Sequence, residues 1–154
     1  MELGDLITPE AVIPALKAKN KKQALQELSE KAAALTGLSA RDIFETLLQR
    51  ERLGSTAVGR GIAIPHGRLP ALKGIFSLFA RLEQPIEFEA VDEEPVDLIF
   101  LLLAPEHAGA DHLKALARIS RLLREPKTIE RLRASHAPAA LYSVLTQPAS
   151  VHAA

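Results

Sequence analysis

The chain has 154 residues, of which 47% are hydrophobic and 25% charged, as is ordinary for a soluble globular protein long enough to bury a core in one domain. Its 19 basic residues balance its 19 acidic residues, so there is no electrostatic footprint for nucleic acid or for an anionic membrane. Because it has no cysteine, a disulfide framework, a thiolate metal site and a thiol nucleophile are excluded.

The first residues carry no export signal. They read MELGDLITPE, which is acidic and lacks the basic start and apolar run of a signal peptide. The strongest apolar run, residues 98–104, ends at Pro105 and is too short to span a bilayer. The sequence therefore predicts a cytoplasmic protein without membrane insertion. Residues 3–13 are expected to form an irregular or short extended lead-in that packs apolar side chains inward.

Two helices are predicted next. Asn20 and Gln23 have the spacing of a capping box and Gly37 suits a helix stop, so the first helix covers residues 21–36. Ser39 begins the second helix. Its apolar stripe consists of Ile43, Phe44, Leu47 and Leu48.

The end of the second helix carries two charged residues near this stripe. Arg50 lies at the stripe's border, and two interpretations are open: an arginine that covers its own helix, or a guanidinium held beside residues 54–68, which begin one turn later. Glu51 falls inside the stripe, so it needs a basic partner or a frayed last turn.

The middle of the chain predicts strands. Short strands are expected over residues 55–58 and 62–64, and the two glycines of Gly59-Arg60-Gly61 suit a tight turn with positive φ between them. Residues 75–82 have strand composition, and residues 86–88 are their expected continuation after a bend.

A central strand and further helices follow. Residues 96–103 are almost unbroken apolar, as expected of a strand covered on both faces. Asp111 is predicted to cap a helix that runs to about Arg124. Its expected inner edge consists of Leu113, Leu116, Ala117, Ser120 and Leu123.

Two prolines begin the last predicted elements. Pro126 and Pro138 suit the first positions of short helices that reach Leu132 and Leu145. We expect residues 147–154 to be a disordered tail. The order of helices, strands and helices lacks strict βαβ alternation, so the expected fold is α/β. It is a single domain over residues 1–146, with a mixed four- or five-stranded sheet sandwiched by helices.

Among the five histidines, His66 and His112 have neighbours that favour chemistry. Pro65 stiffens the backbone before His66, and Gly67 leaves room for a bulky group and offers an amide that can donate to an oxyanion. His112 lies in the first turn of a predicted helix, where free backbone N–H groups favour an anion. Taken locally, a structural loop histidine at His66 remains an open alternative.

These residues form a coherent set for phosphoryl transfer. Neutral imidazole is a nucleophile at cellular pH. Arg50 is always charged and can donate two hydrogen bonds to the oxygens of a phosphoryl group while it is being transferred. His112 can hydrogen-bond the phosphoryl oxygens or fix the ring of His66. Thr56 and the amide of Gly67 are further phosphoryl-binding candidates. No cofactor and no metal are required when a phosphohistidine is the donor.

The stretch ERLGSTAVGRGIAIPHGR, residues 51–68, closely resembles the active-site signature of enzyme IIA domains of the bacterial phosphoenolpyruvate-dependent phosphotransferase system. It looks most like the nitrogen-regulatory branch of the fructose/mannitol type. PVDLIFLLLAP and DHLKALARISRLL extend the similarity, which fades before about Lys19 and after Leu145.

The resemblance implies specific roles. His66 would be the phosphorylated residue, with His112 as the second active-site histidine and Arg50 as the active-site arginine. The donor would be a small HPr-type phosphocarrier. The output would be regulation of targets such as potassium-transport components or sensor kinases. The alternative output is a sugar relay to a permease-linked IIB domain.

Other classes of function are weighed against this one. A phosphorylation-gated binding module is compatible with it, because added charge at one surface site can repel or recruit a partner. A metal site built from His107, Asp111 and His112 matches no established ligand spacing. A serine hydrolase is disfavoured because the sequence contains no GxSxG motif.

Overall fold

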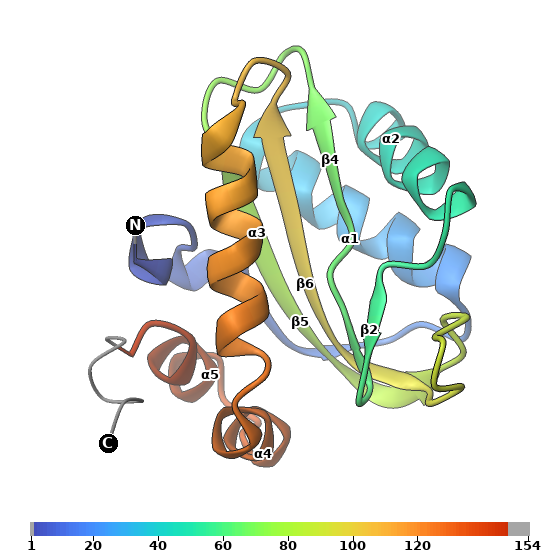
Figure 1. The fold of residues 1–154 in the computed structure, drawn as a ribbon, viewed down its shortest axis with the longest axis vertical. Coiled ribbons are helices and arrows are strands. Elements are labelled where there is room, and N and C mark those ends of the chain that lie inside the picture. Colours follow the sequence, from blue (N-terminus) through green and yellow to red (C-terminus); the bar gives the residue numbers. More distant parts are fainter. Residues whose placement is uncertain (1, 148–154) are drawn as a thin grey trace.

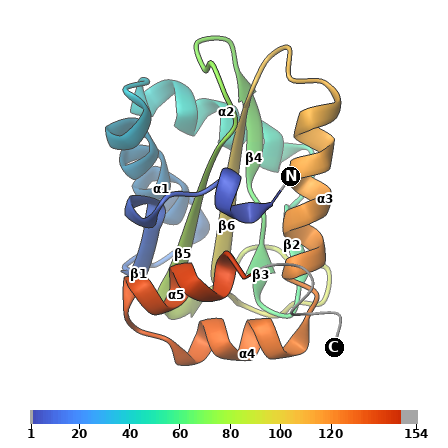
Figure 2. The ribbon, with the colours of Figure 1, turned by 90° about the vertical axis from the view of Figure 1, so that its left-hand side faces the viewer.

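The computed structural model describes residues 2–147, which form one α/β domain with helices on both faces of a mixed sheet, as predicted. Figure 2 shows the sheet nearly edge-on, with α1 and α2 on one side and α3 on the other. The α-helices are α1 (Lys21–Thr36), α2 (Ala40–Arg52), α3 (Ala110–Leu122), α4 (Pro126–Ala134) and α5 (Pro138–Leu145). The strands are β1 (Val12–Leu16), β2 (Ala57–Gly59), β3 (Ile62–Ala63), β4 (His66–Leu69), β5 (Phe76–Ile86) and β6 (Val96–Pro105).

The sheet contains six strands within the described residues, rather than the four or five expected. Its order is β1-β5-β6-β3-β2, and β4 also pairs with β6, beyond β3 along the same edge. β1 is parallel to β5, and β3 and β4 are parallel to β6, whereas the β5–β6 and β2–β3 pairs are antiparallel. β1 begins at the end of residues 3–13, which were expected to be irregular or briefly extended, and continues to Leu16. It contains Pro14 and lies at the sheet edge, where proline is tolerated.

The apolar run in β6 is the centre of the core, as predicted. Every residue from Leu98 to Ala104 is fully buried. β5 covers one edge of β6, and β3 and β4 cover the other, while α3 runs alongside the strand in front of the sheet in Figure 1. Because β4 is tied to this rigid strand, whatever β4 carries is held firmly.

Both of the first two helices begin where capping chemistry predicts, and α1 also ends where it predicts. The Asn20 side chain accepts from the backbone N–H of Gln23 at 2.8 Å, and Gly37 ends α1 with φ of +78°. Ser39 accepts from the N–H of Asp42 and caps α2. Glu51 was expected to have either a basic partner or a place on a frayed last turn. It has a basic partner, since Lys21 Nζ lies 3.0 Å from its carboxylate.

The turn between β2 and β3 also matches expectation. Gly59, Arg60 and Gly61 all have positive φ, at +98°, +59° and +78°. The strand before the turn, β2, begins two residues later than predicted and ends one residue later, at Gly59. The strand after it, β3, begins at Ile62 as predicted and ends one residue earlier, at Ala63. β5 runs without a break to Ile86, and its register against β6 shifts between Arg81 and Ile86, where the bend was expected.

Two predictions for α3 are wrong. Its N-cap is Gly109, with φ of +56°, and Asp111 lies inside the first turn. Its inner face is rotated by about one residue from the expected edge: His112, Ala115, Ile119 and Leu122 are buried, whereas Leu113 is 66% exposed. Of the residues expected on the inner edge, Leu123 is buried and Leu116 packs against the core. Apolar residues occupy a wide arc of this helix, so periodicity alone does not fix which part faces the sheet.

The last two helices start with proline at the first position, as predicted, although α4 extends past Leu132 to Ala134. The tail predicted over residues 147–154 lies outside the described residues except for Gln147. None of the helices in residues 2–147 has both the length and the apolar character that a membrane crossing requires.

Candidate phosphoryl-transfer site

His66 is the first residue of β4, opposite Leu102 of β6, so it does not lie in a loop. The strand was missed because Pro65 and Gly67 both disfavour strand structure, and pairing with β6 overrides them. The ring is half-buried. Its Nδ1 lies 2.9 Å from the carbonyl oxygen of Ile64, so Nδ1 carries the proton and donates it. This arrangement leaves the lone pair on Nε2.

Arg50 reaches His66 from the last turn of α2. Its Nε lies 3.4 Å from Nε2 of His66, and its Nη1 donates to the carbonyl oxygen of Gly54 at 2.9 Å. Of the two interpretations left open for Arg50, the geometry therefore agrees with a guanidinium held beside the histidine segment. A guanidinium fixed in this way needs little reorganisation to meet an anion at Nε2.

His112 is brought beside His66 by the first turn of α3. The ring centroids are 5.8 Å apart and the rings meet edge to face at 70°. His112 is only 6% exposed, and within the described part of the chain its Nε2 has no hydrogen-bond partner. Burial, the nearby charge of Arg68 and the neighbouring His66 together lower the pKa of His112, so its neutral form is favoured.

Arg68 is a member of this cluster that the sequence interpretation missed. Its Nε donates to Nδ1 of His112 at 3.0 Å and its Nη1 donates to the carbonyl oxygen of Glu106 at 3.3 Å. Since Nδ1 of His112 accepts, the proton of the neutral ring lies on Nε2. The signal was present: residues i and i+2 of a strand share a face, so recognising β4 would have linked Arg68 to His66.

The two remaining candidates have other partners. The hydroxyl and the backbone N–H of Thr56 both donate to the carboxylate of Glu51, the latter at 3.0 Å, and within the described residues no hydrogen bond joins Thr56 to His66. A Cβ on Gly67 would lie 2.6 Å from Cγ2 of Thr46, so the absent side chain allows β4 to approach α2 closely. Direct phosphoryl binding by either residue stays a prediction.

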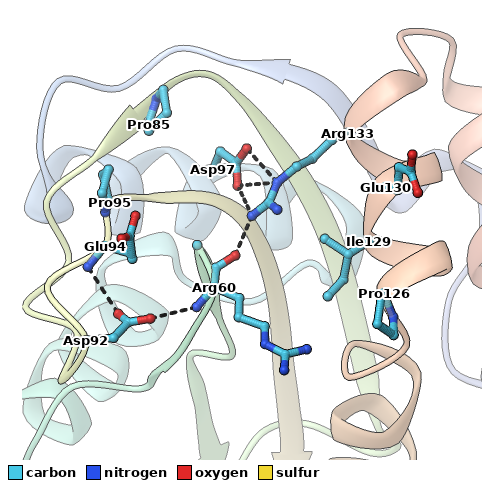
Figure 3. Close-up of a pocket in the computed structure, with 11 residues that line it drawn as sticks. Arg60, Pro85, Asp92, Glu94, Pro95, Asp97, Pro126, Ile129, Glu130 and Arg133 are labelled. Carbon is cyan, nitrogen blue, oxygen red and sulfur yellow. Dashed lines mark hydrogen bonds and ion pairs between the residues drawn. The ribbon is translucent and has the colours of Figure 1, made fainter.

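A cavity of about 740 Å³ lies apart from this cluster, between α4 and the loop that joins β5 to β6. Figure 3 shows Arg133 paired with Asp97 in it, and Asp92 accepting from the backbone N–H groups of Arg60 and Glu94. Those N–H groups hold the pKa of Asp92 below its ordinary value. None of the cavity's lining residues belongs to the histidine cluster. Residues 2–147 also contain no group of three or more potential ligands, among His, Cys, Asp and Glu, placed to hold a metal ion.

Comparisons with known proteins find similar sequences and similar structures. The family model described as phosphoenolpyruvate-dependent sugar phosphotransferase system, EIIA 2, matches residues 5–147. A nitrogen regulatory protein of Bradyrhizobium diazoefficiens is 65% identical over 148 residues, covering 96% of this chain and 97% of that protein. One from Klebsiella oxytoca is 39% identical and covers 97% and 93%. The crystal structure of nitrogen regulatory protein IIA-Ntr from Neisseria meningitidis matches with a TM-score of 0.89 at 33% identity, covering 94% of this chain and 99% of that chain.

Proposed function

Since the chain belongs to the EIIA 2 family of the phosphoenolpyruvate-dependent sugar phosphotransferase system, in which its role is that of a phosphocarrier, we propose that Nε2 of His66 is the atom that accepts the phosphoryl group. The observation that carries the proposal is the hydrogen bond from Nδ1 to the carbonyl of Ile64, together with the approach of Arg50 Nε to Nε2. The first fixes the tautomer in which Nε2 is nucleophilic, and the second supplies positive charge at that atom.

The transfer step balances without an added proton. The lone pair of His66 Nε2 forms the new N–P bond, and the electron pair of the breaking N–P bond returns to the donor's ring nitrogen. The donor in this proposal is the phosphohistidine of an HPr-type carrier. Nδ1 of His66 keeps its proton and its hydrogen bond to Ile64 throughout, so the ring stays in place during transfer.

Arg50 and His112 stabilise the transferred group in this proposal. The phosphoryl group is most loosely bound, and its charge most spread, when it is between the two nitrogens. Arg50 donates to its equatorial oxygens, and the Nε2–H of His112, which has no partner within the described residues, provides a neutral donor next to them. A neutral His112 adds no second positive charge beside His66. Thr56 and Gly67 serve indirectly, by holding the backbone around His66.

The regulatory output follows from the charge that His66 gains. Phosphorylation adds about −1.5 to −2 charges at one surface site, which changes the binding of partners without refolding the chain. We propose that these partners are regulatory proteins, such as potassium-transport components or sensor kinases, reached in the cytoplasm. The names of the nitrogen regulatory relatives support this output. The family description, which names a sugar system, supports the alternative of a sugar relay to a IIB domain.

One labelling experiment tests the assignment. The purified chain is mixed with phosphoenolpyruvate, enzyme I and an HPr-type carrier, and intact mass spectrometry follows the gain of one acid-labile phosphoryl group. Peptide mapping and ³¹P NMR are expected to place it on Nε2 of His66. Label on His112, or on Nδ1, would contradict the proposal. Adding a IIB domain and watching for loss of the label separates a sugar relay from a regulator.

A further inference from the structure

Glu51 is a buried acid whose contacts the transfer step does not use. It is 7% exposed, and its carboxylate accepts from both the backbone N–H and the hydroxyl of Thr56. Lys21 Nζ, at the start of α1, lies 3.0 Å from the same carboxylate. An acid this deeply buried costs stability unless its oxygens are well paired, so three donors on one carboxylate form a firm anchor.

From Thr56 the hydrogen bonds continue to His66. The carbonyl oxygen of Thr56 accepts from the N–H of Ile64 at 3.0 Å. The carbonyl of Ile64 then accepts from Nδ1 of His66 at 2.9 Å. The residue whose carbonyl fixes the histidine tautomer is thus tied, through one intermediate residue, to the Glu51 carboxylate. Chains of this kind are stiffer than their separate bonds, because each bond orients the next.

The same anchor also holds the arginine. Arg50 precedes Glu51 on α2, and its Nη1 donates to the carbonyl of Gly54, two residues before Thr56. The segment from Gly54 to Thr56 is therefore fixed at both ends, by Arg50 and by Glu51. A shift of this segment would move the guanidinium and the Ile64 carbonyl together, and hence both groups that prepare Nε2.

We propose that Glu51 is a positioning residue for phosphoryl acceptance, which acts through Thr56 and Ile64 on the tautomer of His66 and through Gly54 on the placement of Arg50. This inference rests on the proposed function of His66. It gives Thr56, which was expected to bind the phosphoryl group directly, a role one step removed from it. The Lys21–Glu51 pair belongs to the acceptor site in function, although it does not touch the phosphoryl group.

A merely structural ion pair would predict something different. In that case its removal would change the free energy of unfolding but not the histidine tautomer. The test must therefore remove the carboxylate without leaving a buried charge. The paired replacement Lys21→Met with Glu51→Met does this, because unbranched apolar side chains of similar size can replace a buried ion pair with little loss of stability.

The experiment measures two quantities on each variant. The first is the tautomer of His66 in the unphosphorylated protein, from the ¹⁵N shifts of Nδ1 and Nε2. The second is the initial rate of phosphorylation by the HPr-type carrier. For the paired Met variant we expect a population of His66 with the proton on Nε2. We also expect the initial rate of phosphorylation to fall by a factor of up to about ten. Thr56→Val removes only the hydrogen bond from the hydroxyl, so we expect a smaller change in the same direction. This variant provides the test if the paired Met variant does not fold.

Asp97→Asn is the matched control. It weakens the partly buried pair with Arg133 that Figure 3 shows, and neither residue of this pair hydrogen-bonds with Arg50, His66, Arg68 or His112. We expect it to lower the melting temperature and to leave the His66 tautomer and the rate unchanged. An unchanged tautomer and an unchanged rate in both Met and Val variants would overturn the inference. Absence of any label on His66 in the parent protein would instead overturn the proposed function, so the two failures are distinct.

Discussion

Arg50 and His66 meet through Nε and Nε2, 3.4 Å apart, with the arginine on the last turn of α2 and the histidine at the first position of β4. The guanidinium does not depend on the histidine for its position, because Nη1 also donates to the carbonyl of Gly54. The cation is therefore in place before any phosphoryl group arrives. An arrangement of this kind favours the transition state over the resting state.

Replacing Arg50 by lysine should slow phosphorylation of His66 about 10- to 100-fold, because one ammonium nitrogen cannot take the places of both Nη1 beside Gly54 and Nε beside His66. Stopped-flow transfer from the carrier measures the rate. Arg52→Ala is the control: it lies on the same last turn but is exposed, and the rate should stay at the parent value. A rate unaffected by Arg50→Lys would show that the guanidinium fork is not used.

Replacing His66 by alanine should abolish labelling and change the free energy of unfolding by no more than about 1 kcal/mol, because the ring is only half-buried. Intact mass after incubation with the carrier and a urea unfolding curve give the two quantities. His107→Ala removes an exposed histidine near the start of α3 and should label fully. Full labelling of His66→Ala would move the acceptor to another residue.

Replacing Arg68 by glutamine should raise the pKa of His112, because one of the charges that hold that pKa down is removed. It should also free Nδ1 of His112, so that the ring samples both tautomers. An NMR titration of the His112 ring follows both changes. Arg68→Lys keeps the charge, so its His112 should titrate close to the parent value; equal titration of the glutamine variant would contradict the assigned contact.

Much of the fold could be predicted from the sequence, because it follows from interactions between residues close together in the chain. The caps at Asn20 and Ser39 fixed the starts of α1 and α2, and the unbroken apolar run of β6 marked the centre of the sheet. Local chemistry did not predict β4, because Pro65, just before it, and Gly67, its second residue, both disfavour a strand. This segment is a strand because it pairs with Leu102 and Leu103 of β6. Pairing between segments far apart in the chain cannot be predicted from the local pattern of one sequence.

The missed strand explains the missed site residue. The motif identified His66, and the helix-end arginine was expected near it, but Arg68 was left out because a loop has no defined faces. The inner face of α3 was predicted wrongly because apolar residues occupy a wide arc of this helix. His112, which accepts from Arg68 and lies beside His66, is on the buried side, whereas Leu113 is exposed.

Replacing Gly67 by alanine should destabilise the protein by about 1–3 kcal/mol, because the new Cβ would lie 2.6 Å from Cγ2 of Thr46 and force β4 and α2 apart. Adding Thr46→Ser removes that methyl group and should restore most of the loss, as measured by urea unfolding. Gly74→Ala is the control, since a Cβ there meets nothing within 4 Å. If serine at position 46 gave no recovery, the close approach would not be the reason for glycine.

The buried, neutral His112 should make stability depend on pH in a defined direction. Its pKa in the folded chain lies below the ordinary value of 6.5, first because burial penalises the charged ring and then because of Arg68 and His66. As pH falls below 6.5 the unfolded chain binds a proton that the folded chain resists, so the free energy of unfolding decreases with falling pH. Above 6.5 both states are neutral at this residue and the effect vanishes.

Many carboxylates also titrate at lower pH, so the quantity to measure is the difference between parent and His112→Gln in urea unfolding from pH 7.5 to 5. His112→Gln should show a shallower decrease over that range, whereas His136→Gln, which changes an exposed histidine, should follow the parent curve. Parallel curves for the parent and His112→Gln would mean that His112 is as readily protonated in the folded chain as in the unfolded one, and the neutral donor beside His66 would have to be abandoned.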